Sequence, residues 1–116
     1  MQTITAEQLK DMLDAGEPFK LINVLPEHTF RQEHIPGSIN LPVEDENFLH
    51  RVQERIGADK GYPIVVYCAS TECDASPKAG QILDEAGFTN IMDFEAGTAG
   101  WKDAGYPIET GAAQTA

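Results

Sequence analysis

The sequence predicts an α/β fold with an open, mostly parallel five-stranded sheet and helices on both faces. Short apolar runs rich in β-branched and aromatic residues alternate along the chain with segments whose apolar residues recur at helical spacing. The runs at 19–24 and 64–67 are almost continuously apolar, which is typical of strands covered on both faces. Alternating strands and helices build a parallel sheet, because each connecting helix crosses one of its faces.

The first half of the chain supplies three of the predicted strands and three of the helices. The strands are short apolar segments near prolines or loop residues, at 2–4, 19–24 and 38–42. The helices show apolar residues in helical register, at 6–15, 27–33 and 47–56. Thr5 and Gln8 match a capping box at the start of the first helix, and Gly16 and Gly57 are stop signals for the first and third.

The second half continues the alternation. It contains predicted strands at 64–67 and 90–94 and predicted helices at 77–86 and 99–104. Ser76 and Pro77 predict the start of the first of these helices, with Ser76 as N-cap and Pro77 at the first helical position. Trp101 is expected to pack the last helix against the sheet.

Length and charge limit the functions that fit the chain. Its 116 residues suit a single domain, expected over 1–110, with a disordered tail at 111–116. A formal net charge of -11 argues against a nucleic-acid partner. The chain has neither a signal-peptide pattern at its start nor an apolar run long enough for a bilayer, so we expect a cytoplasmic protein without a membrane partner.

The segment after residue 67 is the predicted site. Cys68 directly follows a predicted strand and precedes a helix, and ligands of open parallel sheets bind at this carboxyl edge. Loop amides and the helix dipole there favour a thiolate, which makes Cys68 a candidate nucleophile. The remaining loop residues are mostly small or polar: Ala69, Ser70, Thr71, Glu72, Cys73, Asp74, Ala75 and Ser76.

Cys73 allows three interpretations. Cys68 and Cys73 would close too small a ring to stabilise a fold, and in a reducing compartment two such thiols are expected to be reactive rather than structural. Cys73 is then a resolving thiol, which attacks a persulfide on Cys68 or forms a disulfide with it. The alternatives are that Cys73 is a chance small loop residue, or that both thiols are inert in a core. No paired Cys or His spacing predicts a metal site.

Four segments of the chain resemble the rhodanese-like domain family. They are 21–24, the His-Ile-Pro-Gly segment at 34–42 together with Phe30, 64–68, and 87–108 with its Gly-Phe, Trp and Gly-Tyr-Pro motifs. The resemblance implies the rhodanese-like fold and a sulfurtransferase. In such domains the cysteine corresponding to Cys68 takes sulfane sulfur from a donor, holds it as a persulfide and passes it to a thiol or another acceptor. The implied partners are a small-molecule or protein sulfur donor and a thiol acceptor, and no cofactor is implied.

The chain departs from the family pattern around Cys68. The Ser-Pro helix start falls two residues later than in members with a six-residue loop, which predicts a longer loop. The loop contains Glu72 and Asp74 but no Arg or Lys, and the nearest cation in sequence is Lys78. Members often carry an acidic and then a basic residue where this chain reads Asn23-Val24-Leu25. Like charges next to Cys68 predict that free thiosulfate is a poor donor.

Two further functions compete with a sulfurtransferase. The missing cations favour a non-catalytic binding or redox-sensing module that keeps the fold, whereas the retained Cys68 opposes it. Phosphatase or arsenate-reductase chemistry ranks last, because it requires an Arg that clamps the oxyanion and the loop has none. His34 is expected to be structural, with a hydrogen bond near the Pro-Gly turn.

Overall fold

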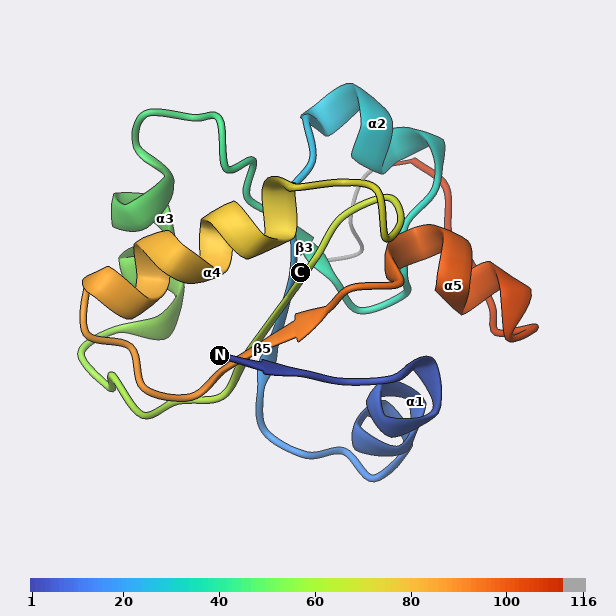
Figure 1. Ribbon diagram of the computed structural model, residues 1–116, viewed down its shortest axis with the longest axis horizontal. Coiled ribbons are helices and arrows are strands. Elements are labelled where there is room, and N and C mark those ends of the chain that lie inside the picture. Colours follow the sequence, from blue (N-terminus) through green and yellow to red (C-terminus); the bar gives the residue numbers. More distant parts are fainter. Residues whose placement is uncertain (112–116) are drawn as a thin grey trace.

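Five parallel strands form the sheet on which the helices are placed (Figure 1). This computed structural model describes residues 1–111. The strands are β1 (Gln2–Thr3), β2 (Lys20–Asn23), β3 (Ile39–Asn40), β4 (Ile64–Tyr67) and β5 (Ile91–Phe94). They pair in parallel in the order β1-β5-β4-β2-β3, which places β4 at the centre. The predicted α/β fold and parallel five-stranded sheet are confirmed.

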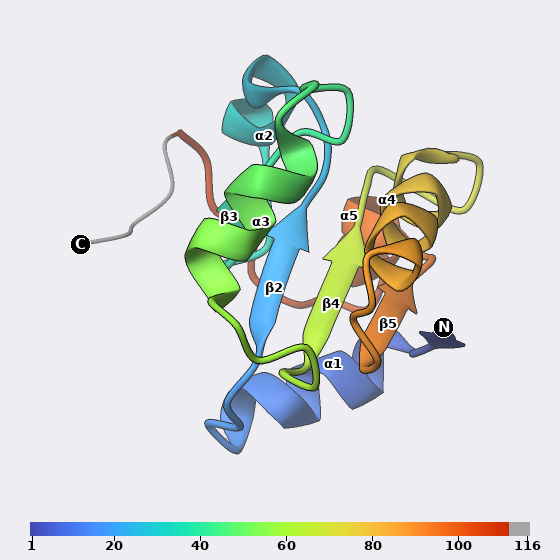
Figure 2. The same ribbon diagram turned by 90° about the vertical axis from the view of Figure 1, so that its left-hand side faces the viewer.

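Helices cover both faces of the sheet (Figures 1 and 2). They are α1 (Ala6–Asp14), α2 (Glu27–Gln32), α3 (Phe48–Ile56), α4 (Ala75–Glu85) and α5 (Gly97–Asp103). One core lies between the sheet and α3 and α4, the other between the sheet and α1 and α5. Val66 of β4 belongs to the first core and its neighbour Val65 to the second. Successive strand residues point to opposite faces, so both must be apolar.

The predicted start of α4 is wrong by two residues. The helix begins at Ala75 with Asp74 as N-cap, because the Lys78 N–H already bonds the Asp74 carbonyl at 3.2 Å. Pro77 is therefore the third helical residue, where its missing N–H still costs no intrahelical bond. Ser76 does not cap the helix and is 1% exposed. The capping box at α1 formed as predicted, with Thr5 Oγ1 accepting from the Gln8 amide at 3.1 Å.

The last segment of the chain is tied back to the domain by His34 and Trp101. The backbones of His34 and Glu109 exchange two hydrogen bonds of 2.9 Å. The His34 ring lies 2.9 Å from the Phe30 carbonyl through Nδ1, which is the structural role predicted for it. Trp101 is buried against the sheet, as expected, and donates from Nε1 to the Pro107 carbonyl at 2.7 Å. Of the tail predicted at 111–116, only Gly111 belongs to the described residues.

Candidate active site

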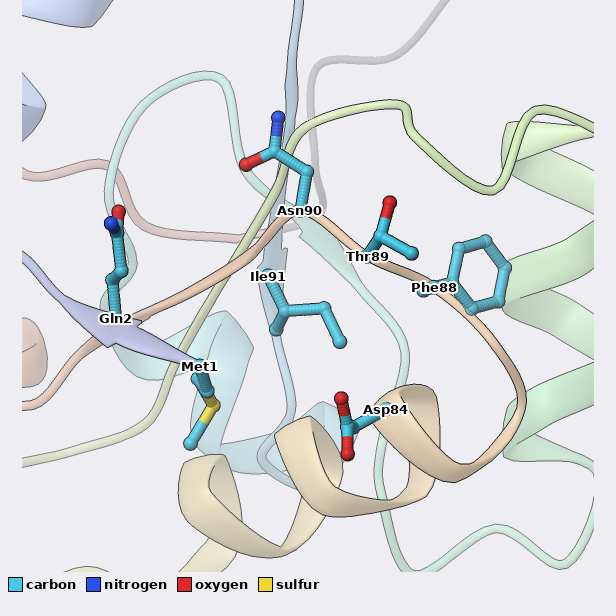
Figure 3. A pocket seen from close by; sticks show the side chains of 7 residues that line it. All are labelled: Met1, Gln2, Asp84, Phe88, Thr89, Asn90 and Ile91. Carbon is cyan, nitrogen blue, oxygen red and sulfur yellow. The ribbon is translucent and has the colours of Figure 1, made fainter.

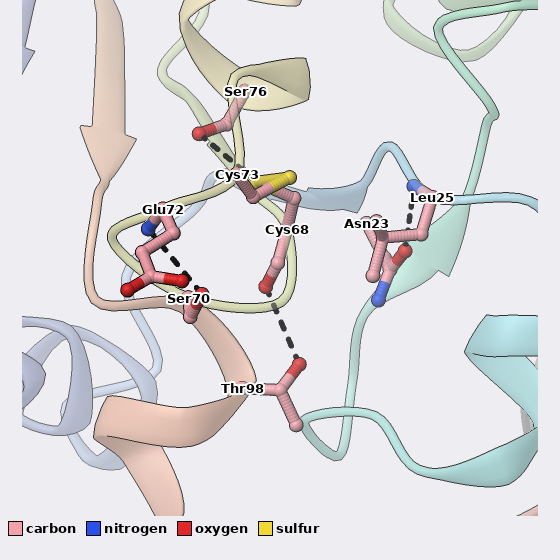
Figure 4. Close-up of a disulfide and its surroundings, with 8 residues drawn as sticks. All are labelled: Asn23, Leu25, Cys68, Ser70, Glu72, Cys73, Ser76 and Thr98. Carbon is pink, nitrogen blue, oxygen red and sulfur yellow. Dashed lines mark hydrogen bonds between the residues drawn. A yellow bond between two sulfur atoms is a disulfide. The ribbon is translucent and has the colours of Figure 1, made fainter.

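Cys68 lies at the carboxyl edge of the sheet, immediately after the central strand β4 (Figure 4). Seven residues, 68–74, connect β4 to α4. Because β4 is flanked by β5 and β2, the loop is surrounded by the ends of neighbouring strands and by helix starts. The Cys68 side chain is 1% exposed and belongs to the core beneath α4.

The first part of the loop is held by the N-terminus of α5. The Thr98 amide donates to the Cys68 carbonyl at 3.0 Å, and the Ala99 amide donates to the Ala69 carbonyl at 2.9 Å. The Thr98 hydroxyl also donates to the Cys68 carbonyl, at 3.4 Å. These bonds use amides that a helix start leaves unpaired, and they fix the backbone that carries the nucleophile.

Gly97 permits the start of α5 to lie close to the loop backbone. Its φ of +61° lies in the left-handed region, and a Cβ there would lie 2.8 Å from the Ala69 carbonyl carbon and 2.9 Å from the Ser70 nitrogen. A side chain would therefore push α5 away from the loop. Gly97 was not among the predicted site residues. A glycine following the last predicted strand was the available signal, but nothing local indicates what approaches it.

Cys68 and Cys73 form a disulfide, and the described residues include no free cysteine (Figure 4). The loop turns at Ser70, whose carbonyl accepts from the Cys73 amide at 3.1 Å and whose hydroxyl accepts from the Glu72 amide at 3.3 Å. These two bonds return the chain so that Cys73 lies over Cys68. The two predicted thiol positions are thus brought together.

Ser76 lies directly against the Cys68 sulfur. Its Oγ is 3.6 Å from Cys68 Sγ, and while the sulfur is in a disulfide only the hydroxyl has a hydrogen to donate. The start of α4 two residues earlier than predicted carries Ser76 into this contact. Ser76 was predicted as a loop residue and cap, so its contact with sulfur was missed.

Asp93 of β5 carries a buried carboxyl group and pairs with Val66 of β4, two residues before Cys68. It is 1% exposed, and its Oδ1 has no hydrogen-bond partner within residues 1–111. Burial raises the pKa of the Asp93 carboxyl above its ordinary value, a hydrogen bond with Ser76 opposes that rise, and the Glu95 charge adds to it. Sequence reasoning missed Asp93, although an acidic residue inside an apolar strand was a visible signal.

The rim of the loop is acidic and open to solvent. Glu72, Asp74 and the adjacent Lys78 are exposed, as are Ala69 and Thr71, whereas Ser70, Cys73 and Ala75 are partly buried. At the end of β2, where the family resemblance implies charged residues, Asn23 is buried and its Oδ1 accepts from the Leu25 amide at 3.0 Å. Residues 68–76 contain no Lys or Arg, so the loop itself supplies no cation that would attract a small dianion.

Two pockets differ in their relation to Cys68. A cavity of about 270 Å³ lies on the backbone side of the loop, between α2 and α5. It is lined by Leu25, Thr29, Gln32, Glu33, Ala69, Thr98, Ala99 and Lys102. A smaller pocket of about 170 Å³ lies at the amino edge of the sheet, between Met1, Asp84 and Ile91 (Figure 3). Since the strands are parallel, this second pocket is at the opposite edge from Cys68.

None of the described His, Cys, Asp and Glu side chains form a group of three or more able to hold a metal ion. Within residues 1–111, no helix has both the length and the apolar character needed to cross a membrane.

Known proteins share this sequence pattern and fold. The family model of the rhodanese-like domain matches residues 5–104. The HTH-type transcriptional regulator Rv0324 of Mycobacterium tuberculosis is 34% identical over 109 residues, which are 94% of this chain but 45% of the regulator. The thiosulfate sulfurtransferase GlpE of Shewanella oneidensis is 29% identical over 101 residues, 87% of this chain and 92% of GlpE.

A solved structure is similar throughout. The solution NMR structure of the rhodanese-like domain of the Anabaena protein Alr3790 superposes with a TM-score of 0.80 and 32% identity. The match covers 95% of this chain and 80% of that one. The chain spans less than half the length of the regulator and nearly the whole length of GlpE.

Proposed function

Because the chain belongs to the rhodanese-like domain family, we propose that it is a sulfurtransferase that carries sulfane sulfur as a persulfide on Cys68. The observation that carries the proposal is the placement of Cys68, at the end of the central strand and in a loop held by α5. The similarity to a protein named as a thiosulfate sulfurtransferase supports the same reaction class. Cys68 is the proposed catalytic residue, and residues 69–76 form the proposed active-site loop.

The cycle begins with reduction of the disulfide. A thiol reductant supplies two electrons, so that Cys68 and Cys73 become free thiols and the reductant becomes a disulfide. The Cys68 thiolate then attacks the outer sulfur of a donor persulfide, R–S–SH. A bond forms between Cys68 Sγ and that sulfur, the donor S–S bond breaks, and RS⁻ leaves with its electron pair.

The second half of the cycle returns the enzyme to its thiolate. An acceptor thiolate attacks the outer sulfur of the Cys68 persulfide, and the Cys68 Sγ–sulfur bond breaks with its electron pair remaining on Sγ. No net oxidation occurs, and the proton released by one thiol is taken up by the other. Loop amides and the start of α4 stabilise the negative charge at each stage.

Cys73 is proposed as the resolving thiol. Its thiolate attacks Cys68 Sγ in the persulfide, expels hydrosulfide and leaves a Cys68–Cys73 disulfide, in a step that balances without an external oxidant. The disulfide in the structure supports this role, because it requires the two sulfur atoms to come within bonding reach. The same bond withdraws the nucleophile until a reductant restores it.

The acidic rim points to a persulfide donor rather than free thiosulfate. Glu72 and Asp74 are exposed beside the nucleophile, and each like charge costs a dianion about 1 kcal/mol in a partly screened site. A thiol persulfide of low molecular weight or on a protein brings less negative charge to the reacting sulfur. The required thiol reductant suits a reducing compartment, and we place the reaction in the cytoplasm.

A redox-sensing module without turnover is the second candidate. The observation that favours it is that the only described cysteines pair with each other and leave Cys68 1% exposed. In that function the disulfide is the signal, and its formation and reduction alter the surface of the loop.

Persulfide trapping separates the two candidates. The reduced chain is incubated with glutathione persulfide, blocked with a persulfide-reactive alkylating reagent and digested for mass spectrometry. A sulfurtransferase gains one sulfur atom on the Cys68 peptide and transfers it to added dithiothreitol as hydrogen sulfide. Cys73→Ser retains the added sulfur longer, because its resolving thiol is missing, whereas Cys68→Ser retains none. Absence of label from every donor, with Cys68→Ser indistinguishable from the parent, would contradict the proposal.

A further inference from the structure

The sulfur-transfer steps leave one buried ionisable group without a role. Asp93 lies in the middle of β5, inside the domain, and its Oδ1 has no hydrogen-bond partner among the residues described. A buried polar atom without a partner costs folding free energy. A carboxyl group in that situation calls for a functional explanation.

The sheet register places Asp93 on the same face as the nucleophile. Asp93 pairs with Val66 of β4, and Val66 and Cys68 both belong to the core beneath α4. In-register residues on neighbouring strands point to the same face. The Asp93 carboxyl is therefore directed to the first turn of α4, where Ser76 is the hydroxyl neighbour that opposes the rise of its pKa. Ser76 in turn lies 3.6 Å from Cys68 Sγ.

Ser76 has one hydroxyl hydrogen and two acceptors that compete for it. When Asp93 is protonated, it donates to Ser76 Oγ, and the Ser76 hydrogen is available to the sulfur of Cys68. When Asp93 is ionised, the carboxylate is the stronger acceptor and takes the Ser76 hydrogen. The Cys68 thiolate then loses a donor and faces a second negative charge.

We propose that Asp93 is a positioning residue for Cys68, which directs the Ser76 hydroxyl toward the sulfur when protonated and away from it when ionised. The inference rests on Cys68 being the nucleophile of the proposed function. The reactivity of the Cys68 thiolate then depends on the ionisation of the Asp93 carboxyl as well as on that of the thiol itself.

Few other charges face Asp93. On β5 itself, Glu95 raises the pKa of the carboxyl. At the start of α4, the charged residues are the N-cap Asp74 and Lys78 in the first turns, both exposed. The facing residues on the two flanking strands are uncharged, Val66 on β4 and Thr3 on β1, and β1 is preceded by the Met1 amino group. Ser76 is thus the neighbour through which Asp93 acts on Cys68.

The test measures alkylation of Cys68 by iodoacetamide in the full chain carrying Cys73→Ser, which leaves one thiol. Rates are recorded from about pH 5 to about pH 9 for this parent, for Asp93→Asn, for Ser76→Ala and for the double variant. We expect two ionisations in the parent profile and one in Asp93→Asn. At neutral pH the Asp93→Asn rate should be about threefold higher, because an amide leaves the Ser76 hydrogen to the thiolate.

Measuring Asp93→Asn in the Ser76→Ala variant shows whether Asp93 affects Cys68 alkylation by way of the Ser76 hydroxyl. We expect Ser76→Ala to react more slowly than the parent at acid pH, where Asp93 is protonated, and to show a smaller change than the parent when Asp93→Asn is added. Glu95→Gln is the matched control, since it removes a neighbouring charge and should keep both ionisations in the profile. If Asp93→Asn does not fold, as judged by circular dichroism, the second ionisation must still be weaker in the Ser76→Ala profile than in that of the parent.

Two results would overturn the inference. One is an Asp93→Asn profile that superposes on the parent; the other is an Asp93→Asn effect of the same size with and without Ser76. Alkylation needs no sulfur donor, so a failure of persulfide trapping leaves this test intact and the two proposals fail separately.

Discussion

Replacing Gly97 by alanine tests whether α5 must begin directly against the Cys68 loop. Two costs add. The φ of +61° places a non-glycine residue in the left-handed region, at about 1–2 kcal/mol. The new Cβ would lie 2.8 and 2.9 Å from backbone atoms of Ala69 and Ser70, and such overpacking costs about 1–3 kcal/mol. The free energy of unfolding should therefore fall by about 2–5 kcal/mol.

Gly16→Ala is the matched control. Its φ of +68° is nearly the same, but no atom lies within 4 Å of a Cβ built there. Only the backbone cost applies, about 1–2 kcal/mol. Urea unfolding of the reduced proteins measures both values.

The same pair of variants tests the link to the nucleophile. Gly97→Ala should also change the Cys68 alkylation rate, since the bonds from Thr98 and Ala99 hold the loop backbone, and Gly16→Ala should leave it unchanged. If Gly97→Ala and Gly16→Ala lost equal stability and showed equal alkylation rates, then α5 would not need a glycine at its contact with the loop.

Three further predictions concern charge and packing. The raised pKa of Asp93 means that the folded protein binds more protons than the unfolded chain in the window above its ordinary value, so stability falls as pH rises through that window. Asp93→Asn should unfold at higher urea than the parent at neutral pH, with the difference fading in acid; a constant difference would contradict this. Trp101→Phe removes the hydrogen bond to Pro107 and should cost about 1–2 kcal/mol in urea unfolding, whereas no loss would show that the bond adds nothing. Glu72→Gln should raise kcat/KM for thiosulfate about threefold to fivefold at low salt, and Glu54→Gln, on the distant α3, should leave it unchanged. An equal gain in both variants would mean that overall charge, and not the loop, governs the donor.

The elements could be predicted because their signals are local. The capping box at Thr5 involves residues three apart in the sequence. The continuous apolar run of β4 follows from the burial of both faces of the strand. Cys68 was placed at the carboxyl edge by topology alone, since parallel strands end on one side. The starts of α4 and α5 were the exceptions, each two residues earlier than predicted. A Ser-Pro pair is a good local start for α4, but the first hydrogen bond formed from Lys78 to Asp74.

The sequence by itself determined the fold class, the strand that carries Cys68 and the acidic, cation-free loop around it, because each depends on neighbouring residues or on periodicity. Tertiary structure alone decided that Ser76 touches the sulfur, that Asp93 is buried on the same face of the sheet as Cys68 and that Gly97 packs against the loop. These contacts join residues far apart in the chain, as where Thr98 and Ala99 bond to residues 68 and 69 across 30 positions. The contacts are determined by the register of β5 on β4 and by the packing of the starts of α4 and α5 against the loop. Neither feature produces a local pattern in the sequence.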